Sequence, residues 1–125
     1  MKIIKFLDDT NELEIEATTE WARTLGEFLH WAIESDYVYI EMLYPVGEED
    51  IFDNLILKLK DIELPDNILC LSDNEYRGAA SIVHVYQTVS ELAFQKFAKN
   101  KYDMLLEDLK EPSKQYRAYR GQRTA

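Results

Sequence analysis

The sequence predicts a single α+β domain in which helices cover one face of an antiparallel or mixed sheet. Short segments alternate apolar and polar residues with the period of a strand, and longer segments repeat apolar residues with the period of a helix. A chain of 125 residues with 46% hydrophobic and 30% charged side chains has the size and composition of one globular domain. We therefore expect the order ββαβαββα over residues 1–111, followed by a basic C-terminal tail at residues 112–125.

Two alternating segments, at residues 3–7 and 12–17, flank four turn-forming residues, which indicates a β-hairpin. Glu12 and Glu16 are then expected on the outer face of the sheet. The expected register has one charged pair and two apolar pairs: Lys5 with Glu14, Phe6 with Leu13, and Ile4 with Ile15.

A helix is predicted to begin at Thr18 or Thr19 and to end near Ser35. Trp31 lies off the apolar stripe of this helix, so we expect its side chain to be only half covered. Residues 37–44 are rich in β-branched and aromatic residues that alternate, which indicates a third strand.

The rest of the chain is expected to contain a helix, a second hairpin and a last helix. Residues 51–62 fit a helix or a strand, and the acidic residues ahead of their apolar stripe favour the helix. Residues 68–71 and 81–87 are predicted to pair as strands. The last helix is predicted to start at a capping box and to stop near Pro112. The box consists of Thr88 and Glu91.

Charge is distributed unevenly along the chain. Residues 1–75 carry nineteen acidic and five basic side chains, a net charge of −14, whereas residues 76–125 carry five acidic and nine basic ones, a net charge of +4. An acidic surface attracts cationic partners and repels polyanions, so nucleic-acid binding is expected only through the tail. The tail interleaves aromatic and basic residues, a composition that can stack on nucleic acid. Docking on the acidic surface of this or a neighbouring subunit, and a solvated terminus, are the alternatives.

Several classes of protein are excluded by what the sequence lacks. Cys70 is its only cysteine, which rules out an intramolecular disulfide and a cysteine-based zinc site and indicates a reducing compartment. No apolar run is long enough for a signal peptide or a membrane span, which predicts a cytoplasmic protein without a membrane partner. Phosphate-binding loops, dinucleotide fingerprints, nucleophile elbows and metal-spaced histidines are also absent. We therefore predict no catalytic residue, cofactor or metal site.

His84 is the titratable residue of greatest interest. In the second predicted hairpin it would lie opposite Cys70, and a histidine beside a cysteine can ionise the thiol for nucleophilic catalysis. A thiol within an apolar strand is more often an inert core group. A small hydrolase or nuclease-like enzyme that uses His84 is therefore kept as an alternative.

A protein-binding surface is the favoured interpretation. Tyr and Trp side chains offer large, rigid contact areas, and carboxylates around them accelerate encounter with a basic partner. Coverage of this surface by the tail or by a second copy of the chain, as a homodimer, is the alternative. The residues predicted to contact a partner are Glu12, Glu14, Glu16, Trp31, Tyr37, Tyr39, Glu41, His84 and Tyr86.

In its size, its acidity and its lack of catalytic motifs, the chain is similar to the small immunity and inhibitor proteins of bacteria and phages. That resemblance implies a protein that blocks a basic nuclease toxin or a defence enzyme, in some members by mimicking the charge of nucleic acid. The leading hypothesis is a non-enzymatic inhibitor that occludes a basic partner through an acidic, Tyr-rich surface. The alternatives are the enzyme that uses His84 and a nucleic-acid-associated protein that acts through the tail.

Overall fold

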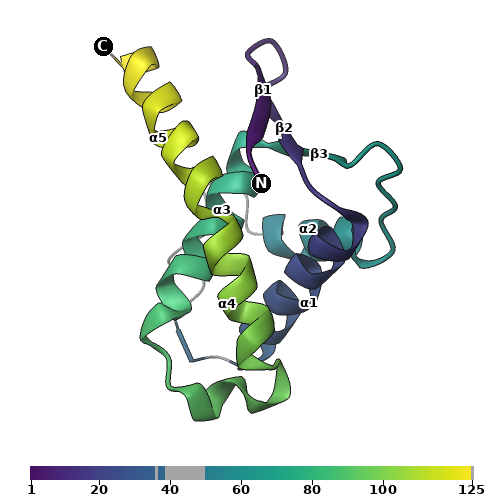
Figure 1. The fold of residues 1–125 in the computed structure, drawn as a ribbon, viewed down its shortest axis with the longest axis vertical. Helices are drawn as coiled ribbons and strands as arrows, with labels where there is room; N and C mark the ends of the chain where they lie inside the picture. Colours follow the sequence, from purple (N-terminus) through teal and green to yellow (C-terminus); the bar gives the residue numbers. More distant parts are fainter. Residues whose placement is uncertain (36, 39–49, 125) are drawn as a thin grey trace.

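The computed structural model describes residues 1–35, 37–38 and 50–124, which fold into a three-stranded antiparallel sheet and five α-helices (Figure 1). The α+β class is confirmed, but the predicted order ββαβαββα is not. No helix in the described part of the chain has the length and apolar composition needed to cross a membrane. The elements in chain order are β1 (Ile3–Leu7), β2 (Glu12–Glu16), α1 (Thr19–Ser35), α2 (Ile51–Lys60), β3 (Ile68–Ser72), α3 (Asp73–Val85), the 3₁₀ helices η2 (Tyr86–Thr88) and η3 (Glu91–Lys96), α4 (Lys99–Asp108) and α5 (Lys110–Thr124).

The sheet has the order β1-β2-β3, and both neighbouring pairs are antiparallel. The predicted pairing of Lys5 with Glu14 and of Phe6 with Leu13 is confirmed. Ile15 is paired with Ile3 instead of Ile4, because the register shifts between Ile3 and Lys5. This shift leaves Ile4 48% exposed.

Helix α2 lies against both α1 and α3, and two glycines permit these close approaches. A Cβ atom at Gly26 of α1 would lie 2.9 Å from the Cβ atom of Leu59, and a Cβ atom at Gly78 of α3 would lie 2.6 Å from the ring of Phe52. Because α2 spans Ile51–Lys60, the prediction of a helix at residues 51–62, rather than a strand, is confirmed.

The predicted strand at residues 81–87 is wrong, since these residues belong to α3 and η2. Helix α3 starts at a capping box: the Ser72 hydroxyl accepts a hydrogen bond from the Glu75 amide at 3.1 Å, and the Glu75 carboxylate accepts one from the Ser72 amide at 2.8 Å. The second hairpin therefore does not form, and β3 pairs with Glu12–Glu16 of β2.

The predicted long helix after Thr88 is also wrong, because it is broken into three pieces. Ser90, rather than Thr88, caps η3. Ala98 has a φ of 66° and separates η3 from α4. Pro112 lies in the first turn of α5. N–H groups in the first turn make no hydrogen bond within the helix, so a proline, which lacks this group, is tolerated there. The chain therefore continues as a helix through most of the predicted tail.

Helix α5 is docked on β1, which brings residues far apart in the sequence into contact. The side-chain amide of Gln115 accepts a hydrogen bond from the Ile3 amide at 2.7 Å and donates one to the Ile3 carbonyl oxygen at 3.1 Å. The rings of Phe6 and Tyr119 stack with their centroids 3.8 Å apart, and the Tyr119 hydroxyl is hydrogen-bonded to Asp8. The tail thus packs on its own domain, and the predicted boundary at residue 112 falls inside α5.

An aromatic cluster fills the core among the helices, with Phe28 fully buried near its centre. The ring centroids of Tyr86, Phe97 and Tyr102 lie 5.7, 5.5 and 5.4 Å from that of Phe28. The Tyr102 hydroxyl donates to the carbonyl oxygen of Val83 at 2.5 Å, so its polar end is satisfied. This cluster holds α1, α3 and α4 together.

Candidate partner-binding site

The outer face of the sheet carries the three glutamates of β2. Along this strand Leu13 and Ile15 are buried, whereas Glu12, Glu14 and Glu16 point to the other side and are partly or fully exposed. This alternation follows from the two-residue period of a strand. We call the side of the sheet that bears these glutamates the acidic face.

Cys70 lies on the acidic face, across the β2–β3 pairing from Glu14. Desolvation raises the pKa of the Cys70 thiol, and the negative charges of Glu14 and Glu12 raise it further, against a smaller opposite effect of Lys58. Both effects disfavour the thiolate, which is the nucleophilic form of cysteine. The predicted opposition of Cys70 and His84 is wrong, because His84 lies in α3 and lines a cavity to which Cys70 does not contribute.

The free edge of β3 is protected by a lysine. The Lys58 ammonium group donates to the Cys70 carbonyl oxygen at 2.7 Å and lies 3.3 Å from the Glu75 carboxylate. A charged side chain at a sheet edge discourages pairing with another strand. Lys58 therefore discourages strand pairing along the β3 edge.

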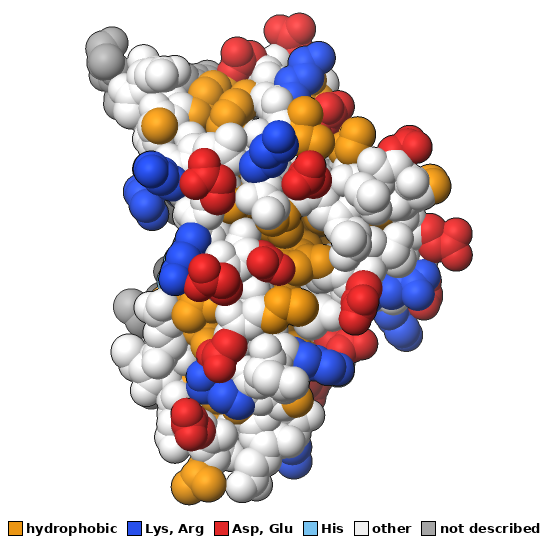
Figure 2. Space-filling model, in the orientation of Figure 1, with side chains coloured by type: hydrophobic (Ala, Val, Ile, Leu, Met, Phe, Trp, Pro, Cys, Tyr) orange, Lys and Arg blue, Asp and Glu red, His pale blue; other side chains and the backbone are white. Residues whose placement is uncertain are grey.

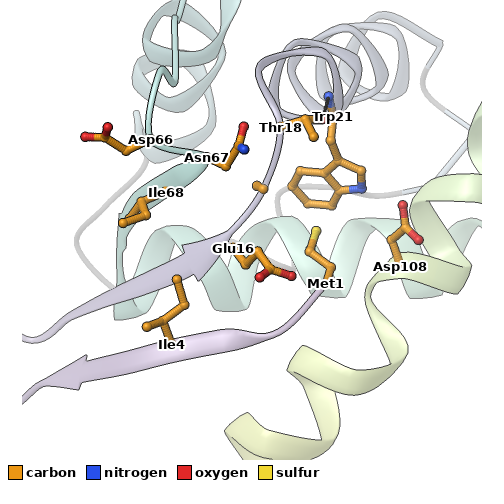
Figure 3. A pocket seen from close by; sticks show the side chains of 10 residues that line it. Met1, Ile4, Glu16, Thr18, Trp21, Asp66, Asn67, Ile68 and Asp108 are labelled. Atoms are coloured by element: carbon orange, nitrogen blue, oxygen red, sulfur yellow. Dashed lines mark hydrogen bonds between the residues drawn. The ribbon is translucent and has the colours of Figure 1, made fainter.

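A cavity of about 520 Å³ adjoins the acidic face (Figure 3), and Glu16 belongs to both. Its lining contains three carboxylates but no Lys or Arg side chain. Ile4 and Ile68 add two exposed apolar side chains at 48% and 37% exposure. We call this the acidic cavity. Its lining residues are Met1, Ile4, Glu16, Ala17, Thr18, Trp21, Asp66, Asn67, Ile68 and Asp108.

The carboxylates are spread along the acidic cavity. In Figure 3, Asp66 and Asp108 lie at opposite ends with Glu16 between them. Over residues 1–35, 37–38 and 50–124, no three His, Cys, Asp or Glu side chains are grouped closely enough to hold a metal ion. The spacing fits contact with several groups of a larger ligand.

Trp21 gives the acidic cavity an unused hydrogen-bond donor. Its side chain is only 5% exposed, and its buried Nε1–H has no hydrogen-bond partner among the described residues. Figure 3 shows the indole nitrogen on the side of Asp108. Leaving a buried donor unpaired costs about 1–3 kcal/mol, so a ligand with an acceptor at this point would gain from pairing with it.

The predicted contact residues fall into separate parts of the molecule. Glu12, Glu14 and Glu16 share the acidic face, as predicted. Trp31 is partly buried and Tyr37 is 56% exposed, and their rings, 6.1 Å apart, line a different cavity with η3. Strand 37–44 and the contact residues Tyr39 and Glu41 lie outside the described residues, apart from Tyr37 and Val38.

The placement of Tyr86 on an outer sheet face is wrong. Tyr86 belongs to η2, is completely buried, and donates a hydrogen bond from its hydroxyl to the Ala32 carbonyl oxygen at 2.8 Å. His84 is likewise on a helix and not on the sheet. Both errors follow from reading residues 81–87 as a strand.

Sequence reasoning did not identify the cavity residues Trp21, Asp66 and Asp108 as parts of one site. Trp21 lies on the buried side of α1, where an apolar residue of an amphipathic helix is expected as part of the core. Asp108 belongs to α4, far along the chain from the other two, and no periodic pattern connects such distant positions.

Comparison of the chain with protein-family models, with curated proteins and with solved structures found no match.

Proposed function

We propose that this protein is a non-enzymatic inhibitor that binds a basic surface of another protein through its acidic face and acidic cavity. The observation that supports this proposal is the continuity of the two features, since Glu16 ends the row of glutamates on β2 and also lines the cavity. A nuclease toxin or a defence enzyme is the class of partner that the chain's size and acidity favour.

The chemistry of the acidic cavity suits a Lys or Arg side chain. Such side chains have an apolar stem and a charged end, and they bury the stem while keeping the charge near polar groups. Ile4 and Ile68 can contact the stem, and the Glu16 carboxylate can pair with the charged end. A backbone carbonyl group of the partner can accept a hydrogen bond from the Nε1–H group of Trp21.

The overall charge of the chain overstates the field that a partner meets. On the face seen in Figure 2, acidic and basic side chains are intermixed, with hydrophobic groups between them. Even on the acidic face, Lys5 is paired with Glu14 across the β1–β2 ladder. Binding is therefore expected to depend on the few carboxylates that adjoin the acidic cavity.

The test uses oligo-arginine and oligo-lysine peptides as probes, with binding measured by calorimetry at low salt. In the triple variant Glu12→Gln, Glu14→Gln, Glu16→Gln we expect affinity to fall about tenfold, since exposed charge pairs contribute about 0.2–1 kcal/mol each. A control triple variant, Asp53→Asn, Glu91→Gln, Glu107→Gln, removes the same charge from α2, η3 and α4.

Two results would contradict the proposal. One is an equal loss of affinity in both triple variants, which would mean that only total charge matters. The other is binding that persists unchanged when salt is raised to about 300 mM, because exposed charges are strongly screened there.

A further inference from the structure

A second cavity, of about 150 Å³, lies between α3 and α5 and has a different character. Its polar lining combines side chains that are separated by about thirty to forty positions in the chain. We call it the α3–α5 cavity. The lining residues used below are Arg77, Ser81 and His84 of α3 and Ser113, Tyr116 and Arg117 of α5.

Asp73 organises the positive charge beside this cavity. Its side chain is 7% exposed, and its carboxylate accepts a hydrogen bond from the Tyr116 hydroxyl at 2.7 Å and lies 3.8 and 3.7 Å from the guanidinium groups of Arg77 and Arg120. One carboxylate thus faces two cations. Arg117 is a third cation in this region, located in the cavity lining, and it forms no ion pair with any residue that the structure describes.

His84 lines the α3–α5 cavity and has an unused polar atom. Its Nε2 atom is buried and has no hydrogen-bond partner within the described part of the chain. Burial lowers the pKa of His84, and the positive charge of Arg117 lowers it further. An anion bound beside both groups would relieve this repulsion.

Hydroxyl groups supply further donors. The hydroxyls of Tyr76 and Ser113 lie 3.3 Å apart, so one of the two protons is left for another acceptor. The Ser81 hydroxyl also lines the α3–α5 cavity. Guanidinium groups recognise phosphate oxygens through paired hydrogen bonds, and several hydroxyl donors suit a ligand with more than two oxygens.

We propose that the α3–α5 cavity binds the phosphate group of a small ligand, held by Arg77 and Arg117 with hydrogen bonds from Ser81 and His84. A cavity of about 150 Å³ can hold a molecule the size of benzene. It therefore admits inorganic phosphate or a phosphate monoester group, and the organic part of an ester stays outside. This site is separate from the acidic cavity and does not rest on the function proposed for it.

The chain has two histidines, so NMR can follow binding at each separately. His84 reports on the α3–α5 cavity, and His30, which is exposed on α1, serves as an internal control. We expect saturable shifts of the His84 ring signals with inorganic phosphate, accompanied by a rise of about half a unit or more in the pKa of His84. The His30 signals should not show these saturable shifts. Chloride at the same ionic strength is the reference, since screening alone would act on both histidines.

Arg117→Gln is expected to weaken phosphate binding about tenfold, the loss expected for one charged hydrogen-bonding group. Arg23→Gln makes the same chemical change on α1, beside a different cavity, and should leave the binding constant within about twofold of the wild-type value. Ser81→Ala is a second probe, which removes a hydroxyl without changing charge. Native amide spectra establish that each variant is folded.

Comparison of inorganic phosphate with O-phosphoserine separates two sources of the same group. Tighter binding of O-phosphoserine assigns the site to a phosphate monoester, and equal or tighter binding of inorganic phosphate assigns it to the free anion. Equal shifts with chloride, or an affinity for phosphate that is unchanged in both Arg117→Gln and Ser81→Ala, would overturn the proposal.

Discussion

The acidic cavity and the α3–α5 cavity differ in how much of their charge is already committed within the protein. Beside the α3–α5 cavity, Asp73 already engages Tyr116, Arg77 and Arg120, whereas Arg117 in the cavity lining makes no ion pair with a described residue. In the acidic cavity, Glu16 and Asp108 make no ion pair with a described residue. The difference shows that the positions of uncommitted charges, rather than the net charge of −10, decide what each surface can attract.

The two cavities also differ in how they depend on the fold. The acidic face is formed by one hairpin and a neighbouring strand, and the acidic cavity beside it is completed by Trp21 of α1 and Asp108 of α4. The α3–α5 cavity exists only while α5 is docked. Variants can therefore disturb both cavities together or one at a time.

The largest effect is expected from a change in the core that supports both cavities. Phe28→Ala removes a fully buried ring that contacts several other aromatic rings, and should lower the free energy of unfolding by about 3–5 kcal/mol. Leu57→Ala is the control, because that side chain is 71% exposed and its loss should cost less than about 0.5 kcal/mol. Urea unfolding measures both values, and similar costs would contradict the described core.

Asp73→Ala is expected to act on the α3–α5 side alone. The substitution leaves the Tyr116 hydroxyl and two guanidinium groups without their common acceptor, and should cost about 2 kcal/mol. Hydrogen exchange should increase in α5 and remain unchanged in β2. Increased exchange in β2 would mean that the two regions are not independent.

Glu107→Ala provides the contrast for Asp73→Ala. Glu107 lies only 2.6 Å from Lys110, but both side chains are about two-thirds exposed. Exposed ion pairs contribute little, so we expect a loss below about 0.5 kcal/mol in urea unfolding. A cost equal to that of Asp73→Ala would show that distance, rather than burial, governs these pairs.

The smallest effect concerns Cys70, which reports the electrostatic field on the acidic face. In the double variant Glu12→Gln, Glu14→Gln we expect a lower thiol pKa and alkylation by iodoacetamide about two- to threefold faster near pH 8. Lys58→Gln should have the opposite effect, because the lysine favours the thiolate. The same direction of change in both variants would be inconsistent with the described field.

Features that depend on neighbouring residues were predictable from the sequence. The alternation in β2 and the apolar stripe of α1 each encode one buried face, and the structure has both. The start of α3 was also encoded, since Ser72 and Glu75 have the spacing of a capping box. The alternation of Val83 and Val85 is typical of a strand. Tyr76 and Val83, however, also have the spacing of one helix face, which agrees with the capping box.

Features that depend on contacts between distant segments were not predictable. The shift that exposes Ile4 has no marker in the sequence, and it brings an apolar side chain to the acidic cavity. The approach of Trp21 to Asp108 depends on how α1 and α4 pack. Arg77 and Arg117 are forty positions apart and meet only because α5 folds back. Tertiary packing decides all three.

The double hydrogen bond between Gln115 and Ile3 joins the last helix to the first strand. Gln115 follows Ile3 by 112 positions, so during synthesis the backbone groups of Ile3 at the edge of β1 emerge long before the side chain that covers them. Until then, the first strand has an open edge that another nascent chain can pair with. Docking of α5 is therefore the step at which this edge of β1 becomes protected from pairing with another copy of the chain.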